Sequence, residues 1–231
     1  MSGYRRVLLK ISGEALMGSL PFGFCPNALT DVCARLCSVN SCEVAVVIGA
    51  GNLFRGGRCS HISRFSADQI GMLATVMNAV SLRDGMRSFG KRARVFSTCF
   101  YASNICEGYS IDRAAAALSD GEIAVCAGGT GAPFFTTDTA AVLRACELSC
   151  DAVFKWTNVD GVYSADPKKY ADAEFYPKLS YQEALDKKLG VMDLTAITMA
   201  WENNMPIVVF SPSKNLSDDI ALKNKCSVIG A

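Results

Sequence analysis

Short runs rich in valine and isoleucine alternate along the chain with longer stretches of helical period. The predicted strands are residues 6–11, 43–48, 93–97, 122–127, 152–155, 206–210 and 226–229. The predicted helices are residues 27–38, 66–89, 111–118, 137–148, 181–187, 194–203 and 216–223. Apolar strands alternating with helices are typical of a parallel sheet buried beneath helices. The sequence therefore predicts an α/β fold of three layers, with a mostly parallel open sheet and helices on both faces.

The length and charge of the chain limit the number of domains it can form and the kinds of partner it can bind. Its 231 residues fit one compact domain or two small ones, and we predict a single domain over residues 1–231 because no linker or low-complexity tract divides it. The 23 basic residues nearly balance the 22 acidic ones, which argues against a nucleic-acid partner. No apolar run approaches the roughly 20 residues that cross a bilayer, and the N-terminus lacks signal-peptide character. We expect a cytoplasmic protein without a membrane partner.

The cysteines do not indicate a disulfide framework. There are eleven, an odd number at irregular spacing in a chain too long to need cross-links. Cys33 with Cys37 and Cys146 with Cys150 lie one helical turn apart, which would suit two metal-bound thiolates. The chain has only one histidine and no CxxC motif, whereas a closed zinc site needs four ligands. We therefore predict reduced thiols that act mainly as small buried side chains.

Several residues carry helix-start signals. Ser180 precedes Glu183 by three residues, which predicts a capping box. Ser66, Thr137 and Asn215 are predicted to cap the first turns of three other helices.

Four glycine-rich segments follow predicted strands. They are residues 10–14, 49–56, 128–138 and 157–167. Each alone could be no more than a turn that needs glycine. Together they bring a lysine, an arginine, hydroxyls and three aspartates to the carboxyl edge of the sheet, where ligands of parallel sheets gather. Backbone N–H groups and helix N-termini bind phosphate oxygens, and fixed cations offset their charge. The segments therefore predict a phosphoryl-transfer site.

Two common nucleotide motifs do not fit the chain. Residues 85–91 have the spacing of a P-loop, but Arg92 stands where a serine or threonine should bind magnesium. That segment is also predicted to lead from a helix into a strand, the reverse of the P-loop order. Four residues separate Gly51 from Gly56, which breaks the dinucleotide fingerprint.

Five motifs in order resemble the bacterial uridylate (UMP) kinases of the amino-acid-kinase superfamily. They are KISGEAL from residue 10, GNLFRG from residue 51, GMLATVMN from residue 71, TGAPFFTTD from residue 130 and VDGVYSADP from residue 159. The similarity runs from about residue 5 to residue 229. It implies an amino-acid-kinase-like fold, direct in-line phosphorylation of UMP to UDP by ATP with Mg²⁺, and a homohexamer built from dimers.

The resemblance also implies roles for single residues. Those implied to bind ATP are Lys10, Ile11, Ser12, Gly13, Gly51, Arg55, Thr157, Asn158, Tyr163 and Asp166. Those implied to bind UMP are Ala50, Asp68, Thr130, Gly131, Ala132, Pro133, Phe134, Phe135, Thr136 and Thr137. The implied catalytic residues are Lys10, Arg55, Asp138 and Asp193, with Mg²⁺ bound through the ATP phosphates instead of a protein metal site.

Purely structural roles remain open for four of these residues. Arg55 would also suit a surface ion pair, and Asp68 would also support the start of a helix. Tyr163 would also pack without touching adenine. Asp193 is equally suited to a helix N-terminus.

Two departures from the family pattern bear on function. Ala50 replaces a glycine that is common in the family, which is acceptable if its φ is negative and the ligand uses only its N–H. The family's GTP-responsive region corresponds to Gly18, Ser19, Leu20, Pro21, Phe22 and Gly23, where the Leu-Pro pair is atypical. GTP and UTP are candidate effectors, and we expect activation by GTP to be weak.

Two other functions compete with this interpretation. A related kinase that phosphorylates a carboxylate or carbamate is disfavoured by residues 130–137. A non-catalytic nucleotide-binding protein on the same fold is disfavoured by Lys10, Arg55 and Asp166 together.

Overall fold

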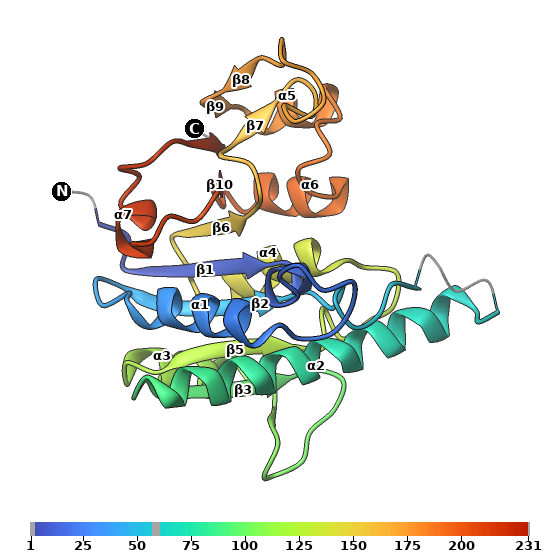
Figure 1. Ribbon diagram of the computed structural model, residues 1–231, viewed down its shortest axis with the longest axis vertical. Coiled ribbons are helices and arrows are strands. Elements are labelled where there is room, and N and C mark those ends of the chain that lie inside the picture. Colours follow the sequence, from blue (N-terminus) through green and yellow to red (C-terminus); the bar gives the residue numbers. More distant parts are fainter. Residues whose placement is uncertain (1–2, 57–60, 231) are drawn as a thin grey trace.

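The central element of the fold is a nine-stranded sheet. The computed structural model describes residues 3–56 and 61–230. The strands lie in the order β4-β3-β5-β2-β1-β6-β10-β11-β9 (Figure 1). All neighbours are parallel except β10 and β11. Their bounds are β1 Arg6–Ile11, β2 Glu43–Ile48, β3 Ala93–Ser97, β4 Glu107–Gly108, β5 Ile123–Ala127, β6 Ala152–Trp156, β9 Lys178–Leu179, β10 Ile207–Phe210 and β11 Cys226–Ile229.

Helices cover both faces of this sheet. Their bounds are α1 Pro26–Cys37, α2 Arg64–Ser88, α3 Ile111–Ser119, α4 Thr137–Glu147, α5 Tyr181–Asp186, α6 Leu194–Glu202 and α7 Leu216–Ile220, with a short 3₁₀ helix, η1, at Gly13–Leu16. One core cluster packs α1, α2 and α7 against one face of the sheet. A second core cluster packs α3, α4, α5 and α6 against the other face. The predicted three-layer α/β architecture is therefore confirmed.

The central strand β1 shows how the sequence forms this sheet. Val7, Leu9 and Ile11 are buried beneath the α1 and α2 layer, and Leu8 is buried on the opposite face. Since side chains of a strand alternate between faces, a strand buried on both sides must be apolar throughout. Each such side chain contributes about 1.5–3 kcal/mol on burial. The two exceptions in β1 are Arg6, at its first position, and Lys10, at the carboxyl edge.

All seven predicted strands and all seven predicted helices are present. The sequence analysis missed η1, β4 and β9, together with a small antiparallel pair formed by β7 (Val162–Tyr163) and β8 (Phe175–Tyr176). The pair β7 and β8 lies at the top of the view in Figure 1, next to α5 and to β9, the last strand of the main sheet. A strand of two residues has no detectable period, which explains why these elements were missed.

Two of the predicted helix caps are confirmed. Ser180 and Glu183 form the capping box of α5, with the Ser180 hydroxyl accepting from the Glu183 N–H at 3.1 Å. The Asn215 side chain accepts from the Ser217 N–H at 3.2 Å at the start of α7.

The two other predicted caps were wrong. Helix α2 begins at Arg64, and its cap is Ser63, whose hydroxyl accepts from the Ser66 N–H at 3.2 Å. Helix α4 is capped by Thr136, which accepts from the Asp138 N–H at 3.0 Å. In both places a second hydroxyl stands within three residues, so the sequence pattern alone could not distinguish the capping residue from a residue of the first turn.

The segment with P-loop spacing runs from a helix into a strand, as predicted. Gly85 lies inside α2, and Lys91 precedes β3. A Cβ atom on Gly85 would lie 2.6 Å from the Cys33 sulfur in α1. Gly85 therefore allows two helices to pack closely and does not form a phosphate loop.

The ten cysteines in the described part of the chain are all free. Burial raises the pKa of Cys33, Cys126 and Cys150 to about 12. Cys59 lies outside the described residues. Within the described ranges, no helix is long and apolar enough to cross a membrane, and no group of three or more His, Cys, Asp or Glu side chains could hold a metal ion.

Candidate active site

The four glycine-rich segments meet at one edge of the sheet. Strands β5, β2, β1 and β6 are consecutive, parallel neighbours, so their carboxyl ends lie side by side. The register places Lys10 of β1 opposite Lys155 of β6. The loops that follow these strands therefore surround a common space, as the sequence predicted.

One carboxylate holds two lysines at the centre of this edge. Asp138 Oδ1 lies 2.8 Å from Lys10 Nζ, and Lys155 Nζ donates a hydrogen bond to Asp138 Oδ2 at 2.6 Å. The exposed fractions of the three side chains are only 12–14%. Lys155 also donates to the backbone carbonyl of Val191. The sequence analysis missed Lys155, although a lysine inside an otherwise apolar strand was a signal.

The environment shifts the charges of this cluster. Burial by itself would raise the pKa of Asp138, but Lys10 and Lys155 outweigh burial and hold that pKa below its usual value of 3.8. Burial lowers the pKa of Lys155 from 10.5, and the nearby Asp138 carboxylate offsets part of this effect. With one carboxylate between two ammonium groups, the cluster carries a net charge of about +1 near neutral pH. Such a site suits an anion.

Asp193 has a structural role that the geometry makes evident. Its side chain caps α6 by accepting from the Ala196 N–H at 2.9 Å. Both oxygens also accept from the Thr139 hydroxyl at 3.0 Å, and the Thr136 hydroxyl donates to Oδ2. Asp193 thus fastens α6 to the first turn of α4, next to Asp138.

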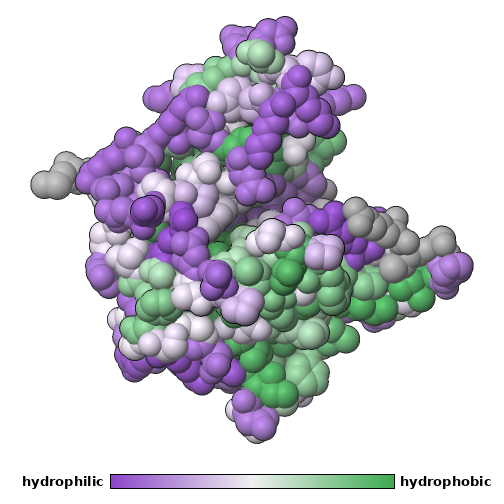
Figure 2. Space-filling view, viewed as in Figure 1, coloured by the Kyte–Doolittle hydropathy of each residue, from purple (hydrophilic) through white to green (hydrophobic). Residues whose placement is uncertain are grey.

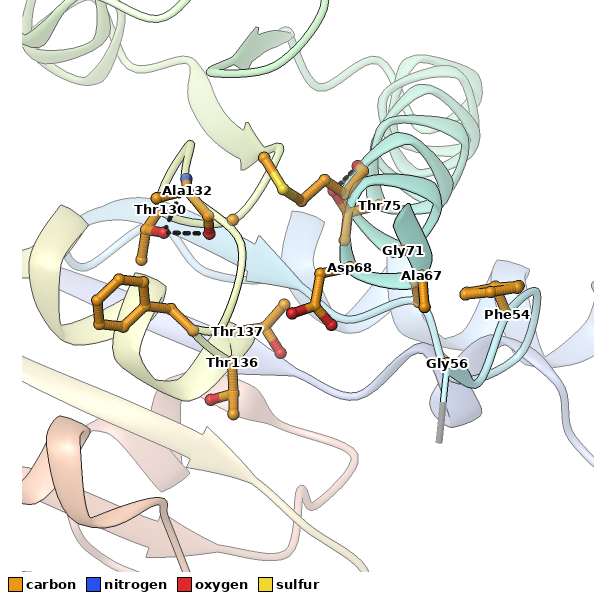
Figure 3. Close-up of a pocket in the computed structure, with 14 residues that line it drawn as sticks. Phe54, Gly56, Ala67, Asp68, Gly71, Thr75, Thr130, Ala132, Thr136 and Thr137 are labelled. Carbon is orange, nitrogen blue, oxygen red and sulfur yellow. Dashed lines mark hydrogen bonds between the residues drawn. The ribbon is translucent and has the colours of Figure 1, made fainter. Parts of the chain in front are cut away.

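A cavity of about 140 Å³ opens beside this cluster, between the loop after β5 and the first turns of α2 (Figure 3). Seven of the ten residues predicted to bind UMP line it: Ala50, Asp68, Thr130, Ala132, Phe135, Thr136 and Thr137. Gly131, Pro133 and Phe134 belong to the same loop but do not line the wall. The sequence analysis missed the remaining wall residues, which are Phe54, Gly56, Ala67, Gly71, Met72, Thr75 and Gly129. Several lie one helical turn apart on α2 beside Asp68, which is the signal that would have found them.

Asp68 links α2 to the loop over the cavity. Its Oδ2 accepts from the backbone N–H of Phe134 at 2.7 Å, and its carboxylate is paired with Arg64 at 2.8 Å. Phe134 has a φ of 73°, a left-handed conformation that is unusual for a bulky residue. The hydrogen bond from Phe134 to Asp68 holds the loop in this conformation, while the carboxylate faces Thr136 and Thr137 (Figure 3).

Gly128 shows why the loop after β5 needs glycine. Its φ is 81°, and a Cβ atom would lie 2.5 Å from Thr98 Oγ1. Its N–H donates to the Thr75 hydroxyl of α2 at 2.8 Å. The loop is therefore attached to α2 at its start through Thr75 and near its middle through Asp68.

The loops after β1 and β2 approach each other closely. A Cβ atom on Gly13 would contact Asn52 Oδ1 and would lie 2.7 Å from the Gly49 carbonyl. Asn52 and Asn78 are both buried and exchange side-chain hydrogen bonds at 3.1 and 2.8 Å. Asn78 also donates to the Gly49 carbonyl at 2.7 Å. These two asparagines, which the sequence analysis did not assign to the site, fix the second loop against α2.

The other residues of these two loops lie as follows. Ile11 ends β1, and the Ser12 hydroxyl accepts from the Glu14 N–H at 3.3 Å. Ala50 does not have a positive φ, which meets the first of the two conditions for replacing glycine there. Arg55 forms an ion pair with Glu14 and donates to the Gly51 carbonyl at 3.1 Å, so it bridges the two loops.

A second cavity, of about 440 Å³, lies between residues 159–167 and 187–191. Tyr163 and Asp166, both predicted to bind ATP, line it. Tyr163 donates to Asp160 Oδ1 at 2.6 Å and accepts from Lys225 at 2.8 Å, and the hydrogen bond from Tyr163 is the main cause of a lowered pKa of Asp160. The Thr157 hydroxyl donates to the Val159 carbonyl at 2.6 Å, and Asn158 is exposed in the turn after β6.

The segment from Gly18 to Gly23 is mostly exposed and adjoins the second loop. Its exposed residues include Leu20, Pro21 and Phe22, and Phe22 retains 65% of its accessible surface. The Gly23 N–H donates to the Asn52 carbonyl at 2.8 Å, and the Asn52 side chain donates to the Gly23 carbonyl at 3.1 Å.

Comparison with known proteins agrees with this geometry. The model of the amino acid kinase family matches residues 5–211. The uridylate kinase of Roseobacter denitrificans is 47% identical over 214 residues, which cover 91% of this chain and 88% of that protein. The uridylate kinase of Cereibacter sphaeroides is 48% identical over 212 residues, which cover 90% of this chain and 86% of that protein.

Solved structures give the same result. The UMP kinase of Bacillus anthracis superposes with a TM-score of 0.92 and is 35% identical in sequence. The match covers 98% of this chain and 96% of that structure. The UMP kinase of Ureaplasma parvum superposes with a TM-score of 0.90 and is 29% identical. This match covers 97% of this chain and 98% of that structure. The chain therefore belongs to the amino acid kinase family and, within it, to the bacterial uridylate (UMP) kinases.

Proposed function

We infer that this protein is a nucleoside monophosphate kinase that transfers the γ-phosphoryl group of ATP to UMP and forms UDP, a step of pyrimidine nucleotide biosynthesis. One observation carries the inference. Thr137 lines the cavity beneath the loop after β5, and the next residue, Asp138, pairs with Lys10 at 2.8 Å. A nucleotide in this cavity would thus have its phosphate beside the cationic cluster, at the N-terminus of α4, where anions are stabilised.

The chemistry needs alignment and charge compensation more than a base. The acceptor phosphate is largely dianionic near neutral pH, since its second pKa is about 6. Lys10, Arg55 and the loop N–H groups would offset the charge on the phosphoryl oxygens in an in-line transfer with a loose transition state. The cavity lined by Tyr163 and Asp166 is large enough to take the ATP nucleoside.

The donor set around the cluster fits Mg²⁺ held by ATP. Asp138 is shared by Lys10 and Lys155, and both oxygens of Asp193 accept hydrogen bonds from threonines. We therefore propose that Mg²⁺ binds through the ATP phosphates, where it would neutralise part of their charge. Lys10 and Arg55 would act on the same phosphates from the protein side.

The decisive experiment measures ADP formation with UMP, CMP, AMP and GMP offered in turn. A site that hydrogen-bonds one base edge leaves buried groups unpaired with another base, so we expect kcat/KM for UMP to exceed that for CMP by at least about 100-fold. Comparable values would refute UMP specificity. Nucleotide binding without ADP formation would instead support the non-catalytic alternative.

We propose that the protein assembles into a homohexamer built from dimers, with α2 at the dimer interface. Leu73 and Met77 of α2 retain 48% and 56% of their surface, and Phe100 and Ile105 are also exposed beside them. These four residues line an apolar cavity of about 460 Å³. Figure 2 shows apolar surface gathered over this part of the molecule. Sedimentation of Met77→Glu should reveal smaller species than the wild type, and an unchanged mass would contradict the interface.

For effectors, we propose that GTP and UTP bind as effectors and that activation by GTP is weak. Pro21 restrains the backbone of residues 18–23 and lacks an N–H donor there. A second location with suitable chemistry is a cavity of about 180 Å³ lined by Arg83, Arg87 and Arg94. Activation of tenfold or more by millimolar GTP would contradict weak activation, and loss of the response in Arg87→Ala would assign it to the arginine-lined cavity.

We also propose a cytoplasmic location and a single domain over residues 1–231. The ten free cysteines of the described part of the chain are consistent with a reducing compartment. The single-domain interpretation is supported by β1, which pairs with β2 on one side and with β6 from the other half of the chain.

A further inference from the structure

Lys155 is a buried cation in a strand that is otherwise apolar. The rest of β6 consists of Ala152, Val153, Phe154 and Trp156, all buried in the core. The Lys155 ammonium reaches Asp138 Oδ2 at 2.6 Å and the carbonyl of Val191. An unneeded charge at this depth would be costly, because burial disfavours an ammonium group. Its position directly opposite Lys10 therefore calls for a function.

The two lysines share Asp138 unequally. Lys155 donates a hydrogen bond to Oδ2 at 2.6 Å, whereas Lys10 forms an ion pair with Oδ1 at 2.8 Å. Lys155 thus holds one oxygen of the carboxylate, while Lys10 pairs with the other oxygen. Because an ammonium has three N–H donors, Lys10 keeps donors for a further acceptor.

The second contact of Lys155 reaches the other cavity. Val191 lines the cavity assigned to the ATP nucleoside and stands two residues before Asp193, the cap of α6. Asp138 follows Thr137, which lines the other cavity. A single ammonium group therefore connects the walls of both cavities at the point where two phosphates would meet.

We propose that Lys155 is a positioning residue for phosphoryl transfer: it orients Asp138 and thereby leaves the Lys10 ammonium available to the transferred group. This inference rests on the proposed kinase function. Without Lys155, the Asp138 carboxylate would turn fully to Lys10 and form a neutral pair. The site would then lose both its excess positive charge and the link between its two cavities.

A merely structural lysine predicts different behaviour. Loss of a stabilising ion pair would lower the unfolding temperature, and KM and kcat would worsen together. The observed geometry predicts the opposite for stability, because Lys155→Met keeps the aliphatic chain, removes a buried charge and leaves Lys10 and Asp138 as a balanced pair. The catalytic effect should therefore appear in a protein that is folded as well as the wild type.

The test compares Lys155→Met and Lys155→Ala with the wild type and with Lys91→Met, a control at the opposite edge of the sheet, between α2 and β3. We expect kcat for UMP phosphorylation to fall about 10- to 100-fold in both Lys155 variants, since misplacement of a reacting group costs this much. KM for UMP should stay within about a factor of three. Ethylammonium should restore part of kcat in Lys155→Ala, whereas ethanol should not.

A pH profile adds a readout that packing alone would not change. The groups facing Lys155 are Asp138, Lys10 and Asp193, so its removal takes away one of the two cations that lower the pKa of Asp138. The acid limb of kcat should consequently move to higher pH in Lys155→Met. A wild-type kcat in Lys155→Met, or losses in kcat that neither ethylammonium nor pH alters, would overturn the proposal. Absence of activity in the wild type would instead refute the kinase function itself.

Discussion

Asp138 is the only anion between two buried ammonium groups in the described structure, so Asp138→Asn should be strongly destabilising. The variant places two positive charges side by side, with side chains that are 12% and 14% exposed. Removing one partner of a buried ion pair typically costs about 3–5 kcal/mol. The asparagine carbonyl can still accept from Lys155, and Lys10 lies at the carboxyl edge of the sheet, so we expect the lower end, about 3 kcal/mol. For a chain of this length that corresponds to a fall in Tm of about 6–12 °C.

Urea unfolding followed by fluorescence measures this loss, with Asp218→Asn as the control. Asp218 pairs with the exposed Lys223, so its substitution should change the free energy of unfolding by no more than about 0.5 kcal/mol. Millimolar inorganic phosphate should stabilise Asp138→Asn more than the wild type, because the variant has an additional unpaired cation. Ligand that binds only the folded state raises its stability by mass action.

The difference in the free energy of unfolding between the wild type and Asp138→Asn should depend on pH, because the pKa of Asp138 is lowered in the folded protein. A carboxyl whose folded pKa is depressed contributes stability above its unfolded pKa, and this contribution is lost as the pH falls through the folded value. The gap between wild type and Asp138→Asn should therefore stay constant from pH 8 to about pH 4. A loss below about 1 kcal/mol at pH 7, or a gap that closes between pH 7 and pH 5, would refute a charged Asp138 at the centre of the cluster.

Three other places in the structure give further predictions. Lys10→Ala should lower kcat about 100-fold, or about 2.7 kcal/mol, with little change in UMP affinity by calorimetry, and Lys10→Arg should restore little; a near-normal kcat would remove the lysine from the mechanism. Gly13→Ala should lower the free energy of unfolding by about 1–3 kcal/mol, since its Cβ would lie 2.7 Å from the Gly49 carbonyl, and an unchanged urea midpoint would contradict this contact. Cys126, buried and with a pKa raised to about 12, should resist iodoacetamide in the native protein while the exposed Cys99 reacts, as peptide mass spectrometry would show.

The helices and strands of the fold could be predicted because buried apolar residues recur in the sequence with the period of a helix or a strand. Each strand of the sheet centre is apolar on both faces, as in β1, and each long helix carries an apolar stripe. Helix starts were harder to place. Ser63 and Ser66 have the same capping chemistry, and only the backbone conformation decides between them.

The residues of the candidate site that lie in or next to the loops after strands could be predicted from the sequence. The residues that reach the site only through tertiary contacts could not. Lys10 and Asp138 follow from segments at the carboxyl edge. Lys155 belongs to a strand, and only the register of β6 against β1 brings it to Asp138. Asn52 and Asn78 are 26 residues apart, and their pairing depends on how α2 lies against the second loop.

The position of β1 within the sheet order has a consequence for synthesis on the ribosome. The strand is complete once residue 11 has been added, but its neighbour β6 ends at residue 156, which is 145 residues later. At about 5–20 residues per second, roughly 7 to 30 s pass before β6 is available. During that time the nascent chain carries an apolar strand with one unpaired edge, a template for association with other chains. Early termination before β6 should therefore give polypeptides that aggregate, whereas loss of the outermost strands would leave the centre of the sheet paired.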